Sequence, residues 1–222
     1  MSTVAIIGAG PLGRWLALAA ARAGFHVLLE DVMPANLHHA QEALRQQLGL
    51  ELCPKSSLNA SGGQEAGPST PHPSDQDLSP GTPDASAAAT SAQDDSIVGV
   101  TFVSTIEDAV RDADLAIDCV PDELESKLEI LLLLDRMAPP RTVLATPTTR
   151  LSIADLAACT YRPDKCVAIA QEASSLAGSP GARILLRTTT KTSPETVALL
   201  DSFWRRLDFT PVFAEETVVS EQ

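Results

Sequence analysis

Short apolar runs alternate with longer amphipathic stretches along most of this chain. Runs rich in β-branched residues and bounded by glycine or polar residues predict strands at Val4–Ile7, Val27–Glu30, Val100–Phe102, Asp114–Val120, Thr142–Ala145, Cys166–Ala170, Arg183–Arg187 and Thr210–Ala214. Helical spacing of apolar residues predicts helices at Pro11–Ala23, Pro34–Leu48, Ile106–Arg111, Glu123–Met137, Ile153–Ala158 and from Pro194 onward. This alternation predicts an α/β fold with a doubly wound, mainly parallel sheet and helices on both faces.

One segment, residues 54–96, interrupts the alternation. It consists mostly of Ser, Pro, Gly, Ala, Asp and Gln, and only Leu58 and Leu78 are large apolar residues. Because it cannot bury enough apolar surface to offset the entropy of ordering, we expect a disordered insertion within a single domain over 1–217. Its serines beside prolines leave open a second interpretation, a partner-binding segment or a phosphorylated switch.

A glycine motif, G-A-G-P-L-G from Gly8 to Gly13, joins the first predicted strand to the first predicted helix. Gly8 permits a tight turn, Gly10 lets a pyrophosphate approach the backbone, and Gly13 lets the helix pack closely on the strand. Pro11 suits the first helical turn, where its missing N–H costs nothing. In this context the motif predicts a Rossmann-type dinucleotide site, with the helix N-terminus facing the phosphates.

An acid in the second strand region completes this fingerprint. Asp31 follows Val27–Glu30, about 20 residues after the glycines, where a carboxylate binds the ribose 2′-hydroxyl. A 2′-phosphate would meet that carboxylate, so Asp31 favours NAD over NADP. Two alternatives stay open: a glycine turn without ligand, and a methyltransferase, which would also place an acid after its second strand.

Composition narrows the functional classes further. The chain has 222 residues, 44% hydrophobic, with a net charge of −13, and this acidity argues against nucleic acid or anionic membranes as partners. The predicted start of the first strand near Thr3 leaves no room for a signal peptide, and the four cysteines show no metal-type pairing. We therefore expect a cytoplasmic protein that binds no metal.

Four blocks, in order, resemble the NAD-binding domain of 3-hydroxyacyl-CoA dehydrogenases: VAIIGAGPLG, DADLAIDCVPDELESK, LATPTTRLSIADLA and TSPETVALL. The resemblance spans nearly all of the chain except the insertion. It implies NAD binding, oxidation of the 3-hydroxyl of an acyl-CoA, and a place in fatty acid metabolism. Members of the family complete the active site and the dimer with a second, helical domain, which we expect this chain to lack because it ends soon after Phe213.

Individual residues carry this resemblance into the candidate site. Val120-Pro121-Asp122 matches a family turn beneath the cofactor, and Lys127 resembles a lysine that contacts the nicotinamide ribose. A solvated lysine on an amphipathic helix is the alternative for Lys127. The candidate cofactor-binding residues are therefore Gly8, Gly10, Pro11, Leu12, Gly13, Asp31, Val120, Pro121, Asp122, Lys127 and Thr146.

The catalytic residues of the family match less well. Thr149 keeps a hydroxyl at the position of the family's catalytic serine, whereas Pro147 replaces an asparagine. The family's catalytic histidine aligns with Ala170, and no acid lies at 182–185, where its partner glutamate would fall. Glu172 would share a strand face with Ala170 and is the candidate alternative base, with a solvent-exposed loop glutamate as the other interpretation.

Three functions follow from these residues. The first is an NAD-dependent oxidoreductase of the 3-hydroxyacyl-CoA dehydrogenase type, acting on an acyl-CoA or a small hydroxy acid. The second is a non-catalytic NAD(H) sensor or partner module, favoured by Ala170 because hydride transfer from a hydroxyl needs a base. The third is a subunit that works only with a separate helical partner. A homo-oligomer is left open.

Overall fold

The computed structural model describes residues 3–52, 96–97, 99–170 and 181–216. The predicted insertion 54–96 lies outside these ranges except for Ser96, and so do Glu172 and His72. None of the described helices is long and apolar enough to cross a lipid bilayer.

A single twisted sheet organises the described residues, with strand order β3-β4-β2-β1-β5-β6-β7-β8-β9. Its strands are β1 (Thr3–Ile7), β2 (His26–Glu30), β3 (Ser96–Ile97), β4 (Val100–Val103), β5 (Leu115–Asp118), β6 (Val143–Pro147), β7 (Cys166–Ile169), β8 (Arg183–Thr188) and β9 (Thr210–Glu215). All neighbours pair in parallel except β3 with β4 and β7 with β8. The Rossmann-type, mainly parallel sheet is confirmed.

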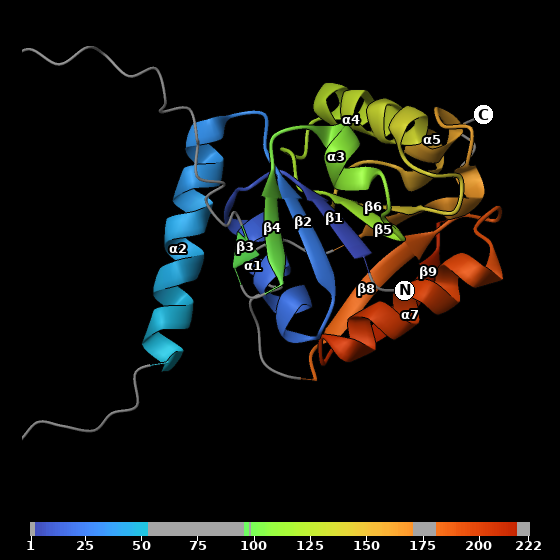
Figure 1. Ribbon diagram of the computed structural model, residues 1–222. Coiled ribbons are helices and arrows are strands. Elements are labelled where there is room, and N and C mark those ends of the chain that lie inside the picture. Colours follow the sequence, from blue (N-terminus) through green and yellow to red (C-terminus); the bar gives the residue numbers. More distant parts are fainter. Residues whose placement is uncertain (1–2, 53–95, 98, 171–180, 217–222) are drawn as a thin grey trace, which may run out of the picture.

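Helices cover both faces of the sheet. They are α1 (Pro11–Arg22), α2 (Pro34–Leu52), α3 (Ile106–Val110), α4 (Leu124–Met137), α5 (Ile153–Ala158), the short 3₁₀ helix η1 (Pro163–Lys165) and α7 (Pro194–Arg206). Figure 1 shows α3, α4 and α5 on one side of the sheet and α1 and α7 on the other. Each face has its own apolar core: Leu16, Phe203 and Trp204 belong to the core beneath α1 and α7, and Leu131 and Leu156 to the core beneath α4 and α5.

Local sequence signals account for several helix boundaries. Ser193 caps α7 by accepting a hydrogen bond from the Thr196 amide, and Pro194 opens that helix, as the sequence predicted. Gly10 precedes α1 without any side-chain cap, so the first-turn amides of α1 receive no side-chain acceptor. This uncapped end lies beside the carboxyl ends of β1 and β5, where parallel sheets of this kind place their ligands.

Candidate functional site

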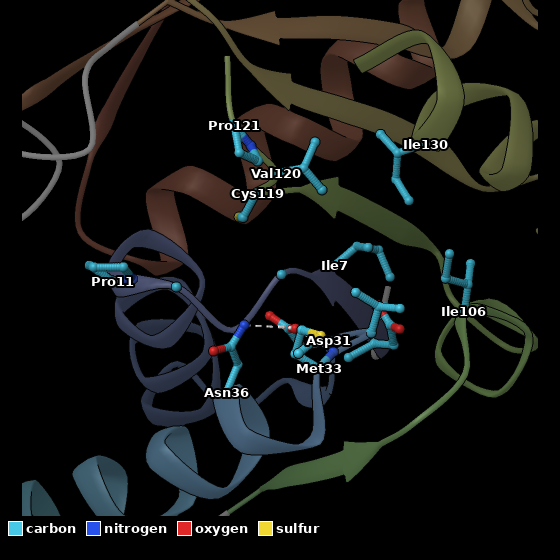
Figure 2. Close-up of a pocket in the computed structure, with 14 residues that line it drawn as sticks. Ile7, Pro11, Asp31, Met33, Asn36, Ile106, Cys119, Val120, Pro121 and Ile130 are labelled. Atoms are coloured by element: carbon cyan, nitrogen blue, oxygen red, sulfur yellow. Dashed lines mark hydrogen bonds between the residues drawn. The ribbon is translucent and has the colours of Figure 1, made fainter. Parts of the chain in front are cut away.

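A cavity of about 490 Å³ opens at the carboxyl ends of β1, β2 and β5. Figure 2 shows its two sides: Pro11 at the start of α1, Asp31 just after β2 and Asn36 on α2 form one side, and Val120, Pro121 and Ile130 face them from the end of β5 and from α4. The cavity therefore brings together the amides of the glycine loop, two carboxylates and a largely apolar opposite wall. An elongated ligand with a charged middle and flat, less polar ends matches this distribution of groups.

Each glycine of the motif has a distinct physical task. Gly8 adopts a φ of +105°, and its amide donates to the Glu30 carbonyl at 2.8 Å, which closes the turn after β1. A Cβ on Gly13 would overlap the Gly8 carbonyl oxygen, so only glycine lets α1 approach β1 this closely. A Cβ on Gly10 would have no heavy atom within 4 Å, because this position faces the open cavity. The space and the uncapped amides therefore fit a diphosphate.

Asp31 lies at the rim of the cavity with a fixed carboxylate. Its Oδ2 accepts from the Ala9 amide at 2.8 Å, and its Oδ1 accepts from the Met33 amide at 2.9 Å and from Asn36 Nδ2 at 3.0 Å (Figure 2). These three bonds hold a negative charge against the glycine loop. A sugar hydroxyl can donate to the remaining lone pairs of this carboxylate, whereas a phosphate there would be repelled.

Glu30 also lines the cavity, and the sequence analysis assigned it no role beyond the strand. Its residue is 4% exposed, and burial together with the neighbouring charge of Asp31 raises the pKa of its carboxyl to about 7. The signal that could have revealed it is the strand period: Glu30 shares a face with the half-buried Leu28, so an acid stands where an apolar residue is expected.

Replacing Glu30 by glutamine tests this raised pKa through stability. Below pH 4.5 both the folded and the unfolded wild type hold the proton, and above about 7 both have lost it. In between, only the unfolded state ionises, so wild-type stability falls across that window as pH rises. The advantage of Glu30→Gln over wild type should therefore grow by about 3 kcal/mol between pH 4.5 and pH 8, measured by urea unfolding.

Glu107→Gln is the matched control, because Glu107 is an exposed acid on the neighbouring helix α3. Its stability difference from wild type should stay nearly constant over the same pH range. An advantage of Glu30→Gln that does not change with pH would contradict the raised pKa.

Lys127 is fully buried, so the solvated-lysine interpretation is wrong. Its Nζ lies 3.2 Å from Oδ2 and 3.3 Å from Oδ1 of Asp118, and Thr146 Oγ1 donates to the same Oδ2 at 2.7 Å. Both Lys127 and Asp118 are 0% exposed. Burial raises the pKa of the Asp118 carboxyl, and the charge of Lys127 and the bonds from Thr146 and Val120 partly oppose that rise.

The Asp118 network supports the cavity from behind. Asp118 Oδ1 accepts from the Val120 amide at 3.0 Å, and Val120 and Pro121 line the cavity, whereas Lys127 and Thr146 do not. The network fixes the turn that forms the far wall. Sequence reasoning selected Lys127 and Thr146 but took Asp118 only as a strand residue; a charged residue inside an otherwise apolar strand was the available signal.

The remaining candidates lie outside the cavity lining. Leu12 packs against the core beneath α1. The Asp122 carboxylate accepts from the Thr149 amide at 3.3 Å, and it lies 3.8 Å from Arg150 Nε. The Thr149 side chain is exposed. Asp122 thus joins the β5 and β6 loops beside the cavity.

The predicted position of the catalytic base, just beyond the end of β7, holds an alanine. Ala170 follows β7, and its amide donates to the Leu185 carbonyl at 2.9 Å. The described histidines, His26, His38 and His39, are exposed on β2 and α2, and none of them lines the cavity. Among the described residues, no group of three or more His, Cys, Asp or Glu side chains could hold a metal ion.

Comparison with known proteins places these residues in a family context. Residues 3–64 and 81–171 match the family model described as 3-hydroxyacyl-CoA dehydrogenase, NAD binding domain. The chain is 26% identical over 164 residues to a probable 3-hydroxybutyryl-CoA dehydrogenase of Bacillus subtilis, covering 74% of this chain and 46% of that protein. It is 25% identical over 223 residues to 5-formyl-3-hydroxy-2-methylpyridine 4-carboxylate 5-dehydrogenase of Mesorhizobium japonicum, covering 97% and 58%.

A solved structure supports the same fold. A diketoreductase superposes with a TM-score of 0.70 at 23% identity, covering 98% of this chain and 65% of that chain. The chain thus spans about half the length of the two curated relatives above.

Proposed function

This chain belongs to the family of 3-hydroxyacyl-CoA dehydrogenase NAD-binding domains, and from that premise we propose that NAD(H) is held in the cavity at the ends of β1, β2 and β5. The observation that carries the proposal is the open space beside Gly10, where a Cβ would meet nothing within 4 Å while the α1 amides lack a side-chain cap. Phosphate oxygens can supply the missing acceptors.

The other cavity residues have complementary tasks in this proposal. Asp31 binds a hydroxyl of the adenosine ribose, since its carboxylate is already oriented by Ala9, Met33 and Asn36. Val120 and Pro121 form the far wall, and the buried pair of Asp118 and Lys127 holds that wall in place. Lys127 therefore acts as a positioning residue, because its ammonium group is paired with the carboxylate of Asp118.

The chemistry available to this chain is narrower than that of its relatives. Bound NAD supplies a carbon that accepts hydride, but oxidation of a hydroxyl also needs a group to take the hydroxyl proton. We infer that Ala170 replaces the catalytic histidine of the family, since a methyl group cannot take a proton. The Thr149 hydroxyl is exposed and carries no basic partner among the described residues.

Ala170 favours a second candidate function. A protein that kept the dinucleotide site and lost the base would report the NAD(H) level to a partner instead of turning over substrate. An oxidoreductase acting on an acyl-CoA or a hydroxy acid remains the first candidate, because relatives of this family are named for such reactions. It would need a base from outside the described residues, and Glu172 stays the candidate for it.

Titration of the full chain with NADH and NADPH tests the cofactor site. NADH should bind at least about tenfold more tightly, since a phosphate placed against Asp31 would cost at least about 1.4 kcal/mol. Asp31→Asn should reduce the ratio of NADH to NADPH affinity. An unchanged melting temperature of this variant would show that the loop is intact. Equal affinities in wild type would contradict the role of Asp31.

The same preparation tests the proposed loss of the base. If the base is lost, reduction of acetoacetyl-CoA by NADH should proceed no faster than without protein. Rapid turnover that disappears in Glu172→Gln would assign the base to Glu172 and contradict the sensor candidate.

A further inference from the structure

We propose that Glu30 determines base specificity: its carboxyl accepts a hydrogen bond from the exocyclic amine of the adenine ring at the apolar end of the cavity. The inference rests on the proposed function in placing an adenine nucleotide there. It goes further by naming the group that distinguishes adenine from a purine without that amine.

Glu30 is a buried acid at the cavity wall. Glu30 is 4% exposed and lines the cavity, and no described residue donates a hydrogen bond to its carboxyl or pairs with it. Burial raises the pKa of the Glu30 carboxyl, and the charge of Asp31 adds to that rise. The described atoms that are enclosed without a hydrogen-bond partner do not include the Glu30 oxygens, so the carboxyl opens onto the cavity, where a ligand or water can donate to it.

The surroundings of Glu30 are largely apolar. The neighbours of Glu30 in the sheet are Ile7 on β1 and Val103 on β4, and both belong to the apolar core beneath α3 and α4. Ile106 and Ile130, from those helices, line the same cavity. The residues that line the cavity from β1, α3 and α4 are thus uncharged, and Glu129 of α4 lines the adjoining hollow. This slot suits a flat ring with one polar edge.

The two acids of the cavity, Glu30 and Asp31, are neighbours in the chain. Asp31, at the proposed ribose position, points toward the glycine loop, where it accepts from Ala9. Glu30 is the preceding residue, and successive side chains of a strand point to opposite faces. Its side chain therefore lies toward α3 and α4, while both acids still line the same cavity. A base is joined directly to its ribose, so a sugar bound at Asp31 places the ring in the neighbouring slot beside Glu30.

The chemistry of the carboxyl gives a signature that depends on pH. Ionised Glu30 accepts from the 6-amino group of adenine but repels the 6-carbonyl of hypoxanthine. Protonated Glu30 can donate to that carbonyl, so discrimination should weaken in acid. Of the other titratable groups nearby among the described residues, Asp31 contacts the sugar and so acts equally on both nucleotides, Cys119 lines the cavity as a thiol whose pKa burial raises, and Glu129 of α4 lines the adjoining hollow.

The test compares ADP with IDP on the full-length chain by calorimetric titration at pH 8.0 and pH 5.5. Wild type should bind ADP roughly 10- to 100-fold more tightly at pH 8.0, the range for a hydrogen bond to a charged group. The ratio should shrink at pH 5.5. In Glu30→Leu the ratio should fall to about one at both pH values, and in Glu30→Gln it should no longer depend on pH.

Glu107→Gln is the control, and it should keep the wild-type ratio. A wild-type ratio near one at pH 8.0, or a ratio that survives in Glu30→Leu, would overturn the inference. If NADH binds but the ratio of ADP to IDP affinity is unchanged in Glu30→Leu, the role of Glu30 is contradicted while the proposed function stands. Binding of ADP with the expected pattern but no binding of NADH would leave Glu30 in place and overturn the proposed function, and no binding of any nucleotide would overturn both.

Discussion

Gly10→Val is expected to abolish NADH binding at concentrations up to the millimolar range while the apo chain stays folded. Gly10 has φ −66° and ψ −177°, a backbone conformation open to any residue, and a Cβ there contacts nothing within 4 Å. The valine side chain would fill the space that we assign to the diphosphate. The helix start would lose about 1 kcal/mol at most, or a few degrees of melting temperature.

Calorimetric titration with NADH and a thermal melt of the same sample check this result. Gly13→Ala supplies the contrast, because its methyl group would overlap the Gly8 carbonyl oxygen and should destabilise the fold itself. Within one motif, Gly10 therefore tests cofactor binding and Gly13 tests folding. Unchanged NADH affinity in Gly10→Val would show that the diphosphate does not lie on this loop.

Lys127→Met should lower the free energy of unfolding by about 3–5 kcal/mol at pH 8, the cost of leaving one member of a buried ion pair alone. Asp118 would keep its bonds from Thr146 and Val120 but lose the cation of Lys127. Burial already raises the pKa of Asp118. Without Lys127 the carboxyl should take up a proton more readily, so the deficit should shrink as pH falls.

Urea unfolding at pH 8 and pH 5 measures this deficit. Lys191→Met, at an exposed lysine, should change stability by less than about 0.5 kcal/mol and serves as the matched control. Adding Asp118→Asn to Lys127→Met should recover much of the loss, because an amide needs no cation. A loss below about 1 kcal/mol for Lys127→Met would contradict the buried pair.

The glycine loop shows how far local sequence reaches. The order of strand, glycines, helix and acid predicted the turn at Gly8, the close approach at Gly13 and the open position at Gly10, and the structure shows all three. Each depends on contacts within about 30 residues of chain, where covalent spacing leaves few arrangements. The antiparallel pairing of β8 with β7 was not predicted, because the spacing of apolar residues does not indicate the direction in which a strand runs.

The acids and the lysine show where sequence reasoning ends. A helical lysine beside glutamates looks solvated in sequence, and only packing of α4 on β5 buries Lys127 against Asp118. Glu30 looks like a strand-end acid until β1 and β4 enclose it among apolar side chains. Burial and charge pairing depend on how separate elements pack together, which no local pattern specifies.

The sequence by itself determined the alternating α/β layout, the glycine turn and the acid that follows β2, since each follows from the side-chain period or the conformational freedom of neighbouring residues. The tertiary structure alone decided which charged groups are buried, what partners them and which of them face the cavity. The reason is physical: the state of an ionisable group depends on the dielectric and the charges around it, and those are set by how separate helices and strands pack together.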